Sequence, residues 1–314
     1  MLKRYFLRII IACGALAIGL FAVWVILVMN KPNLNDDSGK TALHIDEPLS
    51  PVGAQTIVNE DEYKEALADY WIDDDETKIN GYVIKRECVR GENYDENCTL
   101  SIYRNGKRLQ EFDSERRNWL SYGFFNFLGG GASQLVIHSY SGGAHCCDDY
   151  YIYNLGPKFR ELYMSGNYDS GNEIGNELMP IDIDDDGIFE FQQRVMAFDY
   201  FRSSHADSVF PLAIFAYDPK KGRYELANRK FPKFVLDETK KGSDWLTNHV
   251  PVPSGMDKRW LTRLTFLNLV YAGNEKEAWK YFDENYWETD KEDYRREVKN
   301  VFRHDPTYKS IYSR

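Results

Sequence analysis

The chain has 314 residues, of which 43% are hydrophobic and 15% aromatic, a globular composition that excludes wholesale disorder. This length is sufficient for one large domain or two modest ones. The formal net charge of −10 repels phosphate backbones, and the sequence contains no basic stripe with interleaved aromatic residues, so nucleic-acid binding is disfavoured.

The N-terminal segment predicts a membrane anchor over residues 1–30. Ile9–Met29 is uncharged, and a helix of that length, at about 1.5 Å per residue, covers the ~30 Å hydrocarbon core of a bilayer. Lys3, Arg4 and Arg8 precede this run, so the positive-inside rule places the N-terminus in the cytoplasm and the rest of the chain on the other side. A cleaved signal peptide is the alternative, although its apolar region is normally only about 7–15 residues long.

The central part of the chain predicts a β-rich domain over residues 59–250. Residues 31–58 are rich in Pro, Asn, Asp, Ser and Gly and are expected to form a linker. Glu60–Trp71 is expected to form a short amphipathic helix, after which apolar and polar residues alternate between turn signals, as is typical of antiparallel strands. The expected strands are Asn80–Glu87, Thr99–Arg104, Leu120–Asn126, Ser133–Tyr140, Tyr150–Leu155, Phe189–Phe198, Pro211–Tyr217 and Tyr224–Ala227.

The C-terminal residues 251–314 predict a helical cap on this domain. In DKRWLTRLTFLNLVYAG, apolar residues recur at helical spacing and Gly273 supplies a stop. Two further helices are expected to open at N-cap and N3 pairs. The residues on the shared face are Trp260, Leu264, Leu267 and Tyr271, and the two pairs are Asn274 with Glu277 and Thr289 with Glu292. The fold class is therefore α+β, mainly β with a helical C-terminus.

The segment IDIDDDGIFEF, Ile181–Phe191, predicts a calcium site. Its candidate ligands are Asp182, Asp184, Asp186, the Ile188 carbonyl and Glu190. Calcium takes six to eight oxygen ligands, and alternate side chains of a tight turn can converge on one ion while glycine permits the turn. An EF-hand would need a bidentate Glu where Gln193 stands. A solvated turn is the alternative, but several close carboxylates repel one another unless a divalent cation lies among them.

The spacing of this loop resembles the FG-GAP or VCBS calcium loop, D-x-D-x-D-G-x-x-[DE], which joins strands in integrin-α-type β-propeller blades. An ungapped alignment with FFNFLGGGASQLVI, 56 residues upstream, places Asn126 on Asp182 and Gln134 on Glu190. This upstream copy lacks the carboxylates and is not expected to hold a metal. The two copies predict repeated antiparallel β-propeller-like sheets, too few for a closed ring, so that an incomplete propeller is expected.

The cysteines beyond the anchor are Cys88, Cys98, Cys146 and Cys147, an even number for a compartment that should be oxidising. Cys88 and Cys98 bracket a polar loop between two expected strands, so a hairpin closed by a disulfide is the simplest prediction. Cys146 and Cys147 would then form a vicinal disulfide, although crossed pairing with the other two stays open. With His145 they could instead be soft metal ligands, but consecutive residues rarely converge on one ion.

The motif SGGAHCC, Ser141–Cys147, with its surrounding strands, resembles a signature of exported bacterial proteins described as VCBS-like or of unknown function. The resemblance covers about Leu120–Ala227 and implies a fold and a compartment, the periplasmic side of the inner membrane, but no activity. Ser141 has no G-x-S-x-G elbow around it. His205 is a possible repeat counterpart of His145, and the aromatic runs YYIYN and FDYF are either core or a glycan-binding face.

Two functional hypotheses follow from the sequence. The first is a membrane-anchored, extracytoplasmic, calcium-stabilised binding or scaffolding module without catalytic activity, with an envelope protein or a glycan as partner. The second is an envelope hydrolase or a thiol-redox or metal protein that uses His145, Cys146 and Cys147.

Overall fold

The computed structural model describes residues 43–44, 72, 74–90, 96–113, 119–129, 134–140, 148–165, 174–249 and 256–313. All of these belong to one compact unit, Ala42–Arg314. The predicted anchor, residues 1–30, and the helix expected over Glu60–Trp71 lie outside these ranges. Within the described ranges, no helix is both long enough and apolar enough to cross a membrane.

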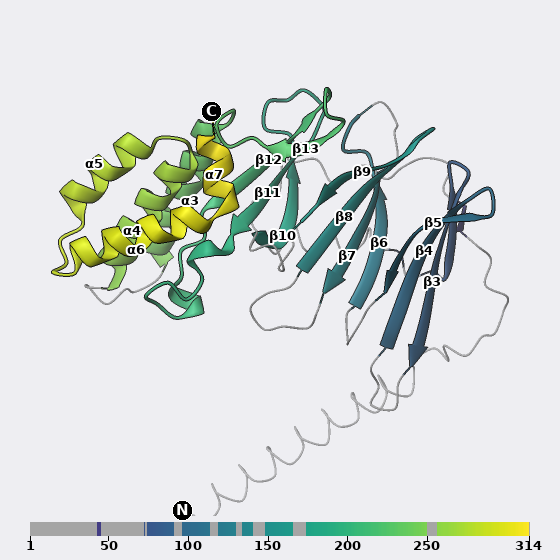
Figure 1. Cartoon of the computed structure of the whole chain (residues 1–314), viewed down its shortest axis with the longest axis horizontal. Helices are drawn as coiled ribbons and strands as arrows, with labels where there is room; N and C mark the ends of the chain where they lie inside the picture. Colours follow the sequence, from purple (N-terminus) through teal and green to yellow (C-terminus); the bar gives the residue numbers. More distant parts are fainter. Residues whose placement is uncertain are drawn as a thin grey trace, which may run out of the picture. The chain divides into compact units, whose positions relative to one another are not determined.

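The β region consists of three sheets, each built around a four-stranded antiparallel meander (Figure 1). In the first sheet a short strand, β1, also pairs in parallel with β2. The first sheet contains β1 (Leu43–His44), β2 (Glu76–Ile79), β3 (Tyr82–Arg90), β4 (Glu96–Arg104) and β5 (Lys107–Asp113). The second contains β6 (Trp119–Phe125), β7 (Gln134–Tyr140), β8 (Asp148–Leu155) and β9 (Phe159–Met164). The third contains β10 (Ile174–Ile181), β11 (Glu190–Val195), β12 (Leu212–Asp218) and β13 (Arg223–Leu226).

Neighbouring sheets share buried apolar side chains, which explains why the strands are apolar on more than one face. Leu100 and Ile102 of β4 lie in one cluster with Tyr122 of β6 and Leu135 of β7. A second cluster joins the second sheet to the third and contains Phe127, Ile152, Tyr163, Phe191 and Tyr224. The burial of these large side chains is the main stabilising contribution at both junctions.

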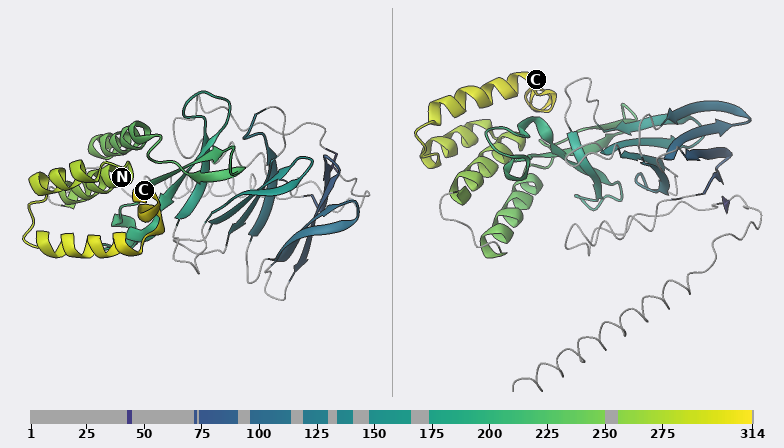
Figure 2. Two further views of the ribbon diagram at one scale, coloured as in Figure 1. Left: turned by 45° about the horizontal axis from the view of Figure 1, so that its top comes forward. Right: turned by 90° about the horizontal axis from the view of Figure 1, so that it is seen from below.

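Among the described residues, five helices follow the third sheet, and the contacts of α4 with β12 and of α7 with β13 place them beside it (Figure 2). They are α3 (Pro232–His249), α4 (Met256–Tyr271), α5 (Glu275–Asn285), α6 (Lys291–His304) and α7 (Pro306–Tyr312). The predicted apolar face of α4 is buried at Leu264, Leu267 and Tyr271. Phe266, Phe282 and Phe302 of α4, α5 and α6 form one core with Ala213 of β12.

The coarse prediction of a mainly β fold with C-terminal helices is thus confirmed, and several elements differ from the expected ones. Every expected strand overlaps an observed strand, but β1, β2, β5 and β9 were not expected, and β1 lies in the segment predicted to be a linker. The last part of Phe189–Phe198 is a short 3-10 helix, Met196–Phe198. Helix α3 lies inside the range assigned to the β domain, and α7 extends the cap.

Cys88 and Cys98 face each other across β3 and β4 and are joined by a disulfide. Replacing both by alanine is expected to lower the free energy of unfolding by about 2–3 kcal/mol, because the closed loop no longer restricts the unfolded chain. Urea denaturation of the variant and of the unchanged chain measures this difference. Equal denaturation midpoints would show that the bond contributes nothing to stability.

Candidate metal centre

The acidic loop is the connection between β10 and β11. Ile181 of β10 pairs with Glu190 of β11, so the loop comprises the residues between them. Its backbone turns back through Asp185 and Gly187, whose φ angles are 56° and 80°. Glycine adopts such a positive φ without steric cost, and aspartate is among the residues that tolerate it best.

Hydrogen bonds within the loop fix the orientation of Asp182. Its Oδ1 accepts from the backbone N–H of Asp186 at 3.0 Å, and its Oδ2 accepts from that of Gly187 at 2.9 Å. The Asp186 carboxylate turns to the backbone and accepts from Ile188 N at 2.8 Å. These are Asx-type bonds, the interactions that the plain-turn alternative predicts.

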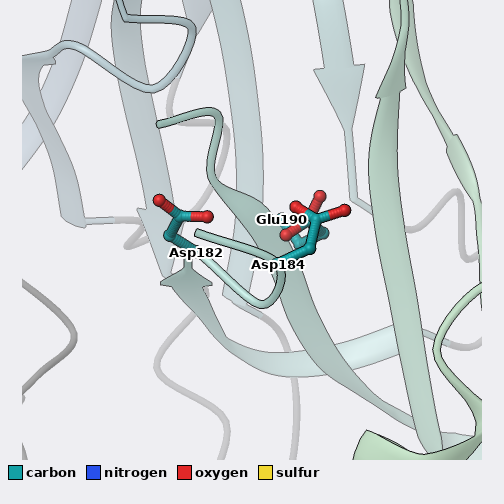
Figure 3. Close-up of side chains that lie close together, drawn as sticks. All are labelled: Asp182, Asp184 and Glu190. Carbon is teal, nitrogen blue, oxygen red and sulfur yellow. The ribbon is translucent and has the colours of Figure 1, made fainter. Parts of the chain in front are cut away.

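Three of the predicted ligands nevertheless converge. One carboxylate oxygen from each of Asp182, Asp184 and Glu190 lies within 4.8 Å of the other two. Figure 3 shows the side chains of Asp184 and Glu190 next to each other, with that of Asp182 to their left. Asp186 is not a member of this group. Carboxylate oxygens are the ligands that calcium and magnesium prefer, so these three residues could hold a divalent cation.

Glu190 is the least exposed of the three, at 2% of its accessible surface. The pKa of its carboxyl is raised to about 7, chiefly by burial and to a smaller extent by the negative charges of Asp184 and Asp186. The N–H of Ile183 and the ammonium of Lys230 oppose this increase. The Ile183 N–H donates to Glu190 Oε2 at 3.0 Å. At neutral pH, therefore, folding places a carboxyl group where its ionised form is disfavoured unless a cation compensates.

A positively charged side chain, that of Lys230, already contacts the carboxylate cluster. Lys230, in the turn between β13 and α3, places its Nζ 3.2 Å from Asp184 Oδ2. Its side chain is more than half exposed, so this contact contributes little to stability. No sequence pattern predicted the pairing of Lys230 with Asp184, because the two residues are far apart in the chain. Tyr224 also lies near Glu190 without a sequence signal that predicted it. Burial and the Glu190 carboxylate raise the pKa of its hydroxyl well above the usual value.

The upstream copy of the loop occupies the equivalent place in the second sheet. Phe125 of β6 pairs with Gln134 of β7, in the same register as Ile181 with Glu190. Gln134 Oε1 accepts from Phe127 N at 2.6 Å and from Leu128 N at 3.2 Å, as Glu190 Oε2 accepts from Ile183 N. The aligned residues thus make equivalent bonds, and we call the described residues of this copy, 126–129 and Gln134, the sister loop.

The two loops also touch each other through their backbones. Phe189 N donates to Phe127 O at 2.8 Å. A Cβ atom on Gly129 would lie 3.2 Å from the carbonyl oxygen of Gly187, and Gly129 has a φ of 68°. A larger residue at position 129 would therefore be strained and would push the loops apart. The acidic loop is thus part of the junction between the second and third sheets.

His205 lies in the connection between β11 and β12, away from the acidic cluster. Its Nδ1 is 2.8 Å from Asp199 Oδ1, and the rings of Tyr200 and Phe210 lie beside it. Arg202 of the same connection forms a bidentate pair with Glu297 of α6, which ties this segment to the helices. Asp199 is therefore the partner of His205 that sequence reasoning did not identify.

The remaining candidates divide into two groups. Ser141, His145, Cys146 and Cys147 lie outside the described residues. The aromatic runs fall largely in the core, as Tyr150, Tyr153 and Phe198 are each at most 4% exposed. Tyr200 is exposed, at 58%. Most of these aromatic side chains therefore cannot form a glycan-binding face.

No protein-family model, no curated protein and no solved structure matches this chain.

Proposed function

We propose that this chain is a membrane-anchored, extracytoplasmic module that binds or scaffolds other envelope components and is stabilised by calcium rather than being an enzyme. Its N-terminal helix would anchor it in the bacterial inner membrane, with the sheets and helices in the periplasm. The partner would be an envelope protein or a glycan.

The observation that carries the calcium part of the proposal is the convergence of Asp182, Asp184 and Glu190 within 4.8 Å. The buried Glu190 supplies a carboxyl group whose ionisation a cation would favour. Asp186 and the Ile188 carbonyl would complete the ligand set after a small rotation of the Asp186 side chain, and water would fill the remaining positions. Lys230 would be displaced from Asp184 by the ion.

The compartment and the finer fold have separate support. The disulfide between Cys88 and Cys98 suits an oxidising compartment such as the periplasm. Three successive four-stranded meanders that share cores are the arrangement of adjacent propeller blades, so we propose an incomplete propeller of three blades. Such stacked sheets offer a broad rigid surface for a partner.

Calcium titration of the full-length chain, purified in detergent, tests the proposal. Saturating calcium is expected to raise the melting temperature by several degrees, since about 2.7 kcal/mol is gained at a hundred times the dissociation constant. Asp184→Asn should abolish the increase. Lys230→Met is the matched control: it removes the ammonium from the same carboxylate, keeps all the proposed ligands, and should retain the increase.

A chain whose melting temperature and calorimetric trace do not respond to calcium would refute the calcium site. Equal responses of the Asp184→Asn variant and the unchanged chain would place the ion elsewhere.

A further inference from the structure

The sister loop contains two buried polar atoms that have no hydrogen-bond partner among the described residues. They are Gln134 Nε2 and Asn126 Oδ1. Gln134 is wholly buried, and its other amide atom accepts from Phe127 N and Leu128 N. Because two N–H donors identify that atom as the oxygen, the unpartnered atom of Gln134 must be the amino nitrogen.

An unpartnered buried polar atom costs about 1–3 kcal/mol, so native proteins seldom leave one unsatisfied. One of the two atoms here is a donor and the other an acceptor. In the register shared by the two loops, they correspond to the carboxylates of Glu190 and Asp182, which approach each other within 4.8 Å. A single water molecule is the smallest group that accepts from an amino nitrogen and donates to a carbonyl oxygen.

We infer that one water molecule lies between Asn126 Oδ1 and Gln134 Nε2 of the sister loop, at the place where the acidic loop would bind its cation. The N–H groups of the Gln134 amide carry partial positive charge, and they face the position that the cation would occupy in the acidic loop. The sister loop therefore does not need a cation. Gln134 is therefore the residue that distinguishes a cation-independent loop from a cation-dependent one. The comparison with an ion rests on the proposed function, whereas the water does not.

A crystal structure of the full-length chain tests the water directly. We expect density for one water about 2.8–3.0 Å from both atoms. Density that shows no water there, or a direct bond from Gln134 Nε2 to another protein group, would overturn the inference.

Conversion of the sister loop tests the role of the amide. The variant Asn126→Asp/Leu128→Asp/Gln134→Glu places carboxylates at the three positions that match Asp182, Asp184 and Glu190. Calorimetry should show one more calcium ion per chain than in the unchanged protein, and the melting temperature in chelator should fall and be restored by calcium. Because Leu128 packs against the core of the second and third sheets, Asn126→Asp/Gln134→Glu, which keeps it, is the companion variant.

The outcomes separate this inference from the proposed function. One ion in the unchanged chain and two in a variant support both. No ion in the unchanged chain and one in a variant support the inference alone and refute the calcium site. A variant that folds without gaining an ion overturns the role assigned to Gln134, and so does failure of both variants to fold in calcium. The water itself is overturned by the crystal structure described above.

Discussion

Replacing Asn228 by leucine is expected to lower the free energy of unfolding by about 3–5 kcal/mol. Asn228 follows β13, is 1% exposed, and connects the third sheet to the helices. Its Oδ1 accepts from Ile214 N at 2.8 Å, and its Nδ2 donates to Leu212 O at 2.7 Å and Tyr271 O at 3.0 Å. Leucine has a similar size but cannot make these bonds, so three buried backbone groups would lose a partner.

The matched control is Asn285→Leu on α5. Asn285 is only half-buried, and its amide donates to one backbone carbonyl, that of Tyr281. Its replacement should cost less than about 1 kcal/mol, because water can take the place of the lost bond. Urea denaturation followed by circular dichroism measures both variants. Similar small losses in the two variants would mean that Asn228 does not hold α4 on β12.

Two of the strands that were not expected from the sequence, β5 and β9, were missed for the same physical reason. A β-bulge adds a residue to one strand and breaks the alternation on which strand prediction depends. Ile152 pairs with Tyr163 but Tyr153 pairs with Glu161, so β9 carries an extra residue and its neighbours Leu162 and Tyr163 are both buried. β5 and β10 contain similar register shifts. The inner strands β3, β4, β7, β8, β11 and β12 were all predicted.

The C-terminal helices show a different limit. Helix α4 was predictable because its apolar face is continuous, whereas α3 contains Gly242 and Ser243 and was assigned to the β domain. Helix α7 did carry a readable signal: Asp305 caps it and Pro306 stands at its first turn. Asp305 also accepts a hydrogen bond from Tyr271 of α4, a buried contact that only the tertiary structure reveals.

The part of the candidate site that was predictable from the sequence is the set of carboxylates in the acidic loop and its aligned copy. The spacing of Asp182, Asp184 and Glu190 predicted their convergence, and the alignment of Gln134 with Glu190 predicted the equivalent loop. The burial of Glu190 and the approach of Lys230 to Asp184 were not predictable. Each depends on how the third sheet packs against its neighbours, which local spacing does not encode.

Replacing Glu190 by glutamine is expected to have opposite effects with and without calcium. Without a cation at about pH 8, the variant should be more stable than the unchanged chain, because it removes a buried carboxylate beside Asp184 and Asp186. With saturating calcium the order should reverse, since the unchanged chain gains about 2.7 kcal/mol at a hundred times its dissociation constant and the variant loses a ligand. The amide also copies Gln134 of the sister loop, which accepts N–H bonds in the same position.

The pH dependence follows from the direction of the pKa shift. Folding raises the pKa of Glu190 from 4.5 to about 7, so the folded state favours the protonated carboxyl. The tighter binding of this proton stabilises the folded state. The stabilisation is fully present below pH 4.5 and is lost as the pH rises through about 7. In chelator, the unchanged chain should therefore lose stability relative to the Glu190→Gln variant across this range. Calcium should remove this loss of stability, because the ion binds and stabilises the carboxylate of Glu190 after the proton has left.

Scanning calorimetry of both proteins between about pH 5 and 8, in chelator and in calcium, measures this difference. Glu277→Gln is the control, because Glu277 is an exposed carboxylate on α5 and its replacement should change neither response. If the Glu190→Gln variant were less stable than the unchanged chain in chelator at every pH, the ionised carboxylate would be stabilised by the protein alone. The fold would then have no need of a cation, and Lys230 would be the residue that neutralises the loop.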